Sequence, residues 1–218
     1  MKQPDRMAPY TKRASLAGAL LACTLLLVGW ADGLEDIREK GKFVDSVQAA
    51  FTQEKYLEML DEPLVSKGLL YLEVPGSLRW EYTGPVRSVL LMENETIRQY
   101  VQADNGMVEQ KSRGLEVMRV FLQDASMWMK GEFEGNPDLV AEMASGRRVL
   151  LKPARDNAMA QMIQYIELRL TDTPGVVESV AIYEEEDTYT VIRFHDTKIN
   201  QDIADEIFQK LNPDALKQ

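Results

Sequence analysis

Hydrophobic positions recur with two different spacings near the start of the chain. Over residues 33 to about 44, apolar or small side chains lie three or four positions apart among charged ones, which predicts a short amphipathic helix. These positions are Leu34, Ile37, Gly41 and Val44. From Val47 the spacing becomes two, which predicts a β-strand. The side chains on one side of this strand are Val47, Ala49, Phe51 and Gln53.

More strands follow with short connections, as in an antiparallel meander. They are predicted over residues 64–74, 78–82, 88–92 and 96–101. Gly68 inside the first of these indicates a bulge or a close approach of another backbone. In the next strand, Leu78, Trp80 and Tyr82 share one face, whereas Arg79 and Glu81 share the opposite face.

Residues 114–130 interrupt the strand pattern. Leu115, Met118, Phe121 and Leu122 recur at the spacing of a helix with an apolar stripe. Strands resume at 147–153, 162–170, 176–184 and 188–194. A last short helix is predicted over 201–210, with Asn200 as its N-cap.

The predicted fold is therefore mainly β, with about eight or nine antiparallel strands and two or three short helices. Many strands have one apolar face, so the sheet should curve into an open barrel with a helical cover. Helices that fill the concave side completely would satisfy this pattern. A lid over a cavity for an apolar guest would satisfy it equally.

Residues 1–31 have the features of an export signal. Four basic residues (Lys2, Arg6, Lys12 and Arg13) precede an apolar run over residues 14–28. This run is shorter than the about 20 residues that a membrane span needs. We expect cleavage after Ala31, which leaves residues 32–218 as a single domain.

Cys23 permits a second interpretation of this leader. Leu20-Leu21-Ala22-Cys23 loosely fits a lipoprotein cleavage box, which would anchor the mature chain to a membrane. Leu21 is bulky for such a box, and the apolar run continues beyond Cys23 to Val28. We therefore expect Cys23 to be discarded with the leader, so that the mature protein has no thiol.

The chain is strongly acidic. Its net charge of −10 becomes −13 when the four basic residues and one acidic residue of the leader are left out. This charge disfavours nucleic acid and anionic headgroups as partners. Acidity could serve solubility, or it could serve a basic docking partner.

The sequence contains few candidates for catalysis. The single histidine, His195, lies beside Asp196, but no cysteine nucleophile and no Gly-x-Ser-x-Gly motif accompanies the pair. No zinc, calcium or phosphate-binding pattern is present. We therefore expect no enzyme, no metal and no cofactor, and a surface or structural role for His195. The acidic run over residues 184–187 is typical of a solvated hairpin tip.

Methionines are frequent around the predicted central helix and in the strands that follow it. They are Met107, Met118, Met127, Met129, Met143, Met159 and Met162. Flexible thioethers suit surfaces that accept varied apolar shapes, but they also fill ordinary cores. Trp80 and Trp128 allow the same two interpretations.

An ordered set of short motifs resembles the periplasmic outer-membrane lipoprotein carrier family, LolA. A first strand ends in Phe51-x-Gln53, a glycine-containing strand follows, and a proline-led strand with a central tryptophan comes next. The matching residues are Phe51, Gln53, Gly68, Pro75, Trp80 and Pro85. The Leu90-Leu91 strand, the helix over 115–122, the strand over 190–194 and Ile207-Phe208 near Pro213 also come in the family's order.

The resemblance implies an open β-barrel with a helical lid over a hydrophobic cavity that takes acyl chains. With strand parity, it places seven residues at that cavity: Leu70, Leu72, Leu78, Trp80, Tyr82, Met118 and Phe121. It also implies a periplasmic, monomeric carrier of acylated lipoproteins or lipids. The carrier would receive cargo from an inner-membrane lipoprotein-releasing transporter and pass it to an outer-membrane acceptor.

Two positions depart from the family's pattern. Val74 stands where carriers have an arginine that helps to latch the lid, and little chain follows Pro213. A relative that carries glycolipids or lipid-linked pigments is therefore an alternative. Another is a periplasmic sensor or regulatory protein on the same fold that binds a protein partner.

Overall fold

The computed structural model describes residues 32–94, 96–111, 115–145, 147–154, 159–171, 173, 176–185, 187–209 and 211. For residues 32, 36, 115–118, 120 and 121 it describes the backbone alone. The predicted leader, including Cys23, lies outside the described residues.

One antiparallel sheet of eleven strands forms the body of the protein. The first meander contains β1 (Ser46–Tyr56), β2 (Leu64–Glu73), β3 (Ser77–Gly84), β4 (Ser88–Glu93), β5 (Thr96–Ala103) and β6 (Gly106–Gln110). The second contains β7 (Leu139–Ala144), β8 (Arg148–Pro153), β9 (Tyr165–Leu170), β10 (Val177–Tyr183) and β11 (Tyr189–Ile199). Pairing of β1 with β11 joins the two meanders and leaves β6 and β7 as the free edges.

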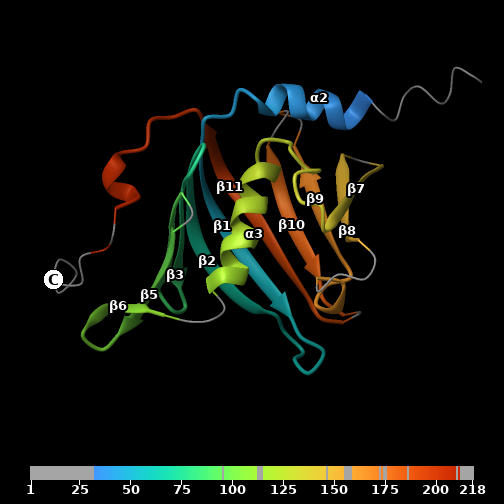
Figure 1. Ribbon diagram of the computed structural model, residues 1–218. Helices are drawn as coiled ribbons and strands as arrows, with labels where there is room; N and C mark the ends of the chain where they lie inside the picture. Colours follow the sequence, from blue (N-terminus) through green and yellow to red (C-terminus); the bar gives the residue numbers. More distant parts are fainter. Residues whose placement is uncertain are drawn as a thin grey trace, which may run out of the picture.

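In the described part of the chain, two α-helices accompany the sheet. Helix α2 (Asp32–Gly41) crosses one end, and α3 (Leu115–Trp128) lies within the concave side, in front of β1 and β11 (Figure 1). Two single-turn 3₁₀ helices complete the described elements, η2 (Met159–Gln161) and η3 (Asp205–Ile207). The predicted fold class, an open and curved antiparallel barrel with helical cover, is confirmed.

The two faces of the sheet have separate apolar clusters. The large concave cluster includes Phe51, Leu78 and Trp80 together with residues of α3. A smaller convex cluster consists of Val89, Leu91, Tyr100 and Met107, against which Leu211 packs. Alternation along each strand therefore sends buried residues to both sides.

Gly68 is a site of close backbone approach, as its place in the sequence predicts. The pairing of β2 with β3 shifts register between Lys67 and Gly68. A Cβ added to Gly68 would clash with the carbonyl oxygen of Glu81 and with the ring of Phe51. Only glycine leaves room for the aromatic ring that packs on this strand.

The predicted helix over 201–210 is wrong. The described residues of this segment form only the single turn η3, and Ala204 rather than Asn200 precedes that turn. The Asn200 amide instead accepts a hydrogen bond from the Asp45 backbone N–H (2.8 Å) and donates one to the Phe43 carbonyl (2.7 Å). These two hydrogen bonds hold Asn200 against the segment that leads into β1.

Several smaller predictions have mixed outcomes. Two strands were not predicted, β6 and β7, and the strand expected from Met162 begins at Tyr165, so Met162 is exposed. His195 is exposed, as expected, but lies inside β11 and not at its end. Glu184, Glu185 and Asp187 lie in the turn between β10 and β11, which confirms the hairpin tip.

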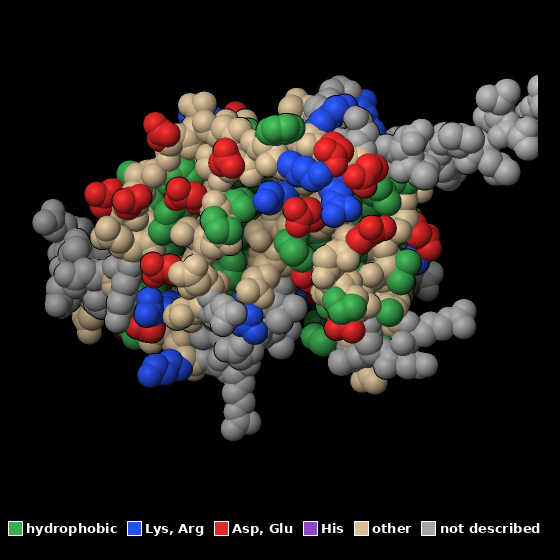
Figure 2. All heavy atoms as spheres, turned by 45° about the horizontal axis from the view of Figure 1, so that its top comes forward, with side chains coloured by type: hydrophobic (Ala, Val, Ile, Leu, Met, Phe, Trp, Pro, Cys, Tyr) green, Lys and Arg blue, Asp and Glu red, His purple; other side chains and the backbone are tan. Residues whose placement is uncertain are grey.

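Basic side chains gather at the end that α2 covers. The last turn of α2 carries Arg38 and Lys40, and Lys42 follows it. Arg38 and Lys42 pair with Glu35 and Glu39 of the same helix. Figure 2 shows this end, with Lys and Arg side chains near its centre and Asp and Glu around them.

Candidate functional site: an apolar hollow under helix α3

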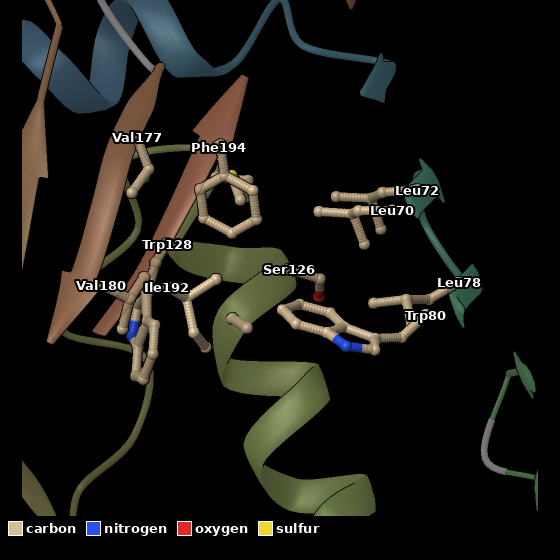
Figure 3. Close-up of a pocket in the computed structure, with 12 residues that line it drawn as sticks. Leu70, Leu72, Leu78, Trp80, Ser126, Trp128, Val177, Val180, Ile192 and Phe194 are labelled. Carbon is tan, nitrogen blue, oxygen red and sulfur yellow. The ribbon is translucent and has the colours of Figure 1, made fainter. Parts of the chain in front are cut away.

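A small hollow lies between α3 and the concave face of the sheet (Figure 3). It encloses about 20 Å³. Its walls are Leu70, Leu72, Leu78, Trp80, Ala125, Ser126, Trp128, Met129, Val177, Val180, Ile192 and Phe194. Eleven of these twelve side chains are apolar, so the hollow offers a guest mainly dispersion and hydrophobic contact.

Strand register builds one wall from the first meander. Leu70 lies opposite Trp80, and Leu72 lies opposite Leu78, on neighbouring strands β2 and β3. Because side chains two apart share a face, all four point to the concave side. The Trp80 ring also meets the Phe51 ring, with centroids 4.5 Å apart.

The second meander supplies the opposite wall. Ile192 and Phe194 come from β11, and Val177 and Val180 come from β10. Phe194 meets Trp80 edge-on across the hollow, with ring centroids 6.3 Å apart. The pairing of β1 with β11 and the curvature of the sheet bring these distant segments together.

Helix α3 closes the hollow from the concave side. Figure 3 shows Trp128 lying against Val180 and Ile192, while Ser126 lies near Trp80. The Ser126 hydroxyl donates to the Gln123 carbonyl of its own helix (2.7 Å). Among the described residues, Trp80 Nε1 is buried without a hydrogen-bond acceptor. The helix therefore contacts the sheet here through apolar surface.

The seven predicted cavity residues are placed as follows. Leu70, Leu72, Leu78 and Trp80 line the hollow. Tyr82 lies beside it, where its hydroxyl donates to Gln53 Oε1 (2.8 Å) and burial raises its pKa. The side chains of Met118 and Phe121 lie outside the described part of the chain. Whether these residues bind lipid stays a prediction.

The wall residues of β10, β11 and the end of α3 were not among the seven predicted cavity residues. Ile192 and Phe194 stand out in the sequence as the apolar face of a strand, but alternation does not reveal which distant strand they face. Trp128 and Met129 stand out only as apolar residues at the end of the predicted helix.

In the described state the site is closed. A void of about 20 Å³ holds about one water molecule, whereas ligand pockets measure about 300–1,000 Å³. At this hollow, the described residues are therefore closer to the filled arrangement than to an open cavity. A guest of the size of an acyl chain does not fit this hollow with its walls in these positions.

The described side-chain contacts that hold α3 lie at its C-terminal half. Asp124 is buried, and its Oδ2 accepts a hydrogen bond from Asn136 Nδ2 (2.6 Å) in the loop that follows. Asn136 Oδ1 in turn accepts one from the Asp138 backbone N–H (2.8 Å). Burial raises the pKa of Asp124, since it penalises the ionised carboxylate.

The end of α3 also abuts α2. Gly131 has a positive φ of 72°, and an added Cβ there would crowd the Ile37 carbonyl oxygen at 2.9 Å. Gly41 lies against the Lys130 carbonyl so closely that no side chain fits between them. These two glycines let the helices meet backbone to backbone.

Val74 lies at a second hollow beside α3. This groove of about 140 Å³ separates the β2–β3 turn from the helix. It is lined by Val74, Pro75 and Gly76 on one side and by Gln123, Ser126, Met127 and Lys130 on the other. Val74, where the resemblance implies a latching arginine, therefore lies across this groove from α3, and its side chain offers no cation.

The described residues contain no group of three or more His, Cys, Asp or Glu side chains able to hold a metal ion. Within the same ranges, no helix combines the length and the apolar character that crossing a membrane requires.

The family model of the outer membrane lipoprotein carrier protein LolA matches residues 42–210. The chain belongs to the LolA family. The matched segment starts before β1 and reaches past η3, so it covers the sheet, α3 and the hollow. Proteins of this family are carriers.

Two relatives are named outer-membrane lipoprotein carrier protein. The one from Proteus mirabilis is 26% identical over 129 residues, which are 55% of this chain and 63% of that protein. The one from Cronobacter sakazakii is 24% identical over 159 residues, which are 69% of this chain and 78% of that protein. The chain thus spans less than two thirds of the Proteus LolA.

Among solved structures, an uncharacterized conserved protein from Thermus thermophilus superposes with a TM-score of 0.51 at 12% identity. The match covers 85% of this chain and 96% of that one. At this identity the likeness shows a shared fold and no more.

Proposed function

We propose that the protein is a periplasmic carrier that shields the acyl chains of lipoproteins, or of a related lipid, between the inner and the outer membrane. The observation that carries this proposal is the apolar concave face, which one helix covers and which encloses a hollow. Membership of the LolA family and the carrier names of its relatives support it.

In this proposal, the acyl chain of the cargo replaces helix α3 on the apolar concave face. Each methylene moved from water to an apolar surface gains about 0.8 kcal/mol. Release of α3 exposes the apolar walls and costs part of this gain. The net affinity is therefore the difference between two apolar contacts, which keeps the cargo transferable.

The remaining parts of the proposal concern the route. Residues 1–31 direct export and are removed after Ala31. The mature monomer then accepts acylated cargo from an inner-membrane lipoprotein-releasing transporter and delivers it to an outer-membrane acceptor. Relatives named as lipoprotein carriers support this route.

The two tryptophans of residues 32–218, Trp80 and Trp128, both line the hollow. Their fluorescence therefore reports on this site alone. Titration with a fatty acid brominated along its chain should quench both tryptophans with one-to-one stoichiometry, because bromine quenches on contact. The same acid without bromine is the control for changes caused by α3 movement.

Native mass spectrometry and lipid extraction of the protein purified from a periplasm complete the test. Bound lipid or lipoprotein together with quenching supports the carrier. Stoichiometric binding without quenching would place the lipid elsewhere and contradict the proposal. A protein without lipid that ignores acyl probes would favour the sensor that binds a protein partner.

A further inference from the structure

Four tyrosines form a stacked row across β1 and three strands of the second meander. Their order, Tyr56, Tyr189, Tyr183 and Tyr165, follows the register of β1, β11, β10 and β9. Successive ring centroids are 4.4, 5.4 and 4.3 Å apart, with interplanar angles of 14°, 22° and 20°. Alternation with buried Thr190 and Ile166 places this tyrosine row on the convex face.

The tyrosine row lies at the base of an apolar hairpin tip. The β1–β2 connection begins directly after Tyr56 and turns through a hydrogen bond from the Leu60 N–H to the Leu57 carbonyl (2.9 Å). Met59 at the tip is 87% exposed, more than any other large apolar side chain described. Leu60, Leu64 and Val65 are also exposed. Figure 1 shows this hairpin projecting at the end opposite α2.

Carboxylates surround the hairpin tip and the neighbouring β10–β11 turn. Five are exposed: Glu58, Asp61, Glu62, Glu185 and Asp187. None of the five pairs with a basic side chain among the described residues. Lys55, at the same end, already pairs with Glu184 at 3.4 Å.

We infer that this end of the sheet docks a protein partner that presents an apolar pocket rimmed by Lys and Arg. An exposed methionine and leucine at a hairpin tip can fill such a pocket. The tyrosine row beside them adds a rigid aromatic contact surface, and tyrosine is enriched at protein interfaces. The five carboxylates give the complementary rim and steer encounter with a basic surface.

The same charges select against two other occupants. An anionic membrane surface repels five carboxylates that surround the inserting side chains. A second copy docked through the same surface would place both sets of carboxylates against each other. A basic protein is the occupant that this pattern fits.

The inference is tested by photo-cross-linking in cells that make the full chain. A benzophenone amino acid replaces Met59 in one variant and Phe43 in another, since Phe43 is 76% exposed near the opposite end. We expect one protein adduct from position 59 that position 43 does not give. Its cross-linked peptide should lie in an apolar site flanked by Lys and Arg.

A charge variant separates docking from chance collision. Glu58→Gln, Asp61→Asn and Glu62→Gln together should lower the adduct from position 59 about tenfold, as loss of three rim charges predicts. The matched control neutralises Glu73, Glu93 and Asp202, which are exposed near the other end, and should leave the adduct unchanged. All charge variants should keep their melting temperature.

Lipid adducts, adducts between two copies of this chain, or no adduct specific to position 59 would each overturn the inference. So would a specific adduct that resists the triple neutralisation. None of these outcomes depends on whether the hollow binds an acyl chain.

Discussion

Both faces of this sheet are covered, the concave face by α3 and the convex face by the C-terminal segment. Different kinds of contact hold these two covers. On the convex face, Arg79 donates to Glu81 Oε2 (2.9 and 2.6 Å) and to the Ile207 carbonyl of the C-terminal segment (3.0 Å). On the concave face, Leu78 and Trp80 of the same strand meet α3 through apolar contact. A hydrogen bond from Arg79 ties the convex cover to the sheet, whereas the described contacts between α3 and this strand are apolar.

This difference indicates which cover can be exchanged. Removing the C-terminal segment would leave the buried Arg79 guanidinium without one of its acceptors, and such a loss costs about 1–3 kcal/mol. Removing α3 costs apolar contact that another apolar body can restore. Asp124 and Ser126 of α3 direct their polar atoms to Asn136 and Gln123, not to the sheet.

Glutamate substitutions on the two faces give the strongest test. Leu91 is buried on the convex face and Leu78 on the concave face, at 4% and 2% exposure. Leu91→Glu should unfold the protein, with a loss of about 4 kcal/mol or more, because its cover is fixed. Leu78→Glu should lose about 2 kcal/mol, keep the β-sheet and abolish uptake of an acyl probe, because α3 can release the charge to water. Chemical denaturation and circular dichroism measure both, and equal losses would refute the comparison.

Alanine substitutions at two glycines test how tightly the concave face is packed. Gly68→Ala should destabilise the fold by about 2–3 kcal/mol, because its Cβ would meet the Phe51 ring and the Glu81 carbonyl. Gly84→Ala is the control, since nothing lies within 4 Å of a Cβ there. Urea denaturation should show the loss in the first variant alone. A neutral Gly68→Ala would mean that the aromatic cluster adapts.

Loosening the cover of the concave face should speed cargo entry. Asn136→Ala removes the partner of the buried Asp124 carboxylate, a loss of about 1.5 kcal/mol for the closed state. Uptake of an acyl probe should then become about tenfold faster in stopped-flow fluorescence. Asn105→Ala, in the exposed β5–β6 turn, is the control. Lower stability without faster uptake would show that this hydrogen bond does not hold α3 in place.

The smallest expected effects concern two acids whose pKa values move in opposite directions. Burial raises the pKa of Asp124, so its ionisation destabilises the fold, and stability from this group increases as pH falls toward the ordinary pKa of about 3.9. The Arg193 guanidinium, 2.6 Å from Glu54, lowers the pKa of that carboxyl. Stability from Glu54 is present above its ordinary pKa of about 4.3 and is lost as pH falls through the lowered one.

Unfolding free energies measured from pH 7 to pH 3 should separate the two groups. Asp124→Asn should remove the gain on acidification, whereas Glu54→Gln should remove a loss of less than about 1 kcal/mol. The same pH dependence in both variants would contradict the assignment.

The sequence predicts the interior of the sheet better than its margins. Nine strands follow from alternation and turn residues, but β6 and β7 do not, and these are the two free edges. β6 has a single buried residue, Met107, so one of its faces gives almost no pattern. Asn200 has the local features of a helix cap, but contacts with Phe43 and Asp45, more than 150 residues away, decide its role.

The site divides in the same way. Parity on β2 and β3 identifies four wall residues, because their faces follow from neighbours in the chain. The walls from β10 and β11 depend on the long-range pairing with β1 and on curvature. No local sequence pattern predicts which of two apolar sheet faces will curve around a given helix.

The free edges β6 and β7 have a mechanical consequence. A closed barrel has a fixed girth, because every strand is hydrogen-bonded to two others. Here the two edge strands, β6 and β7, are not paired with each other, so the sheet can widen without breaking a strand pair. In the proposed carrier, bulkier acyl groups would be accommodated by spreading the two edges of the sheet.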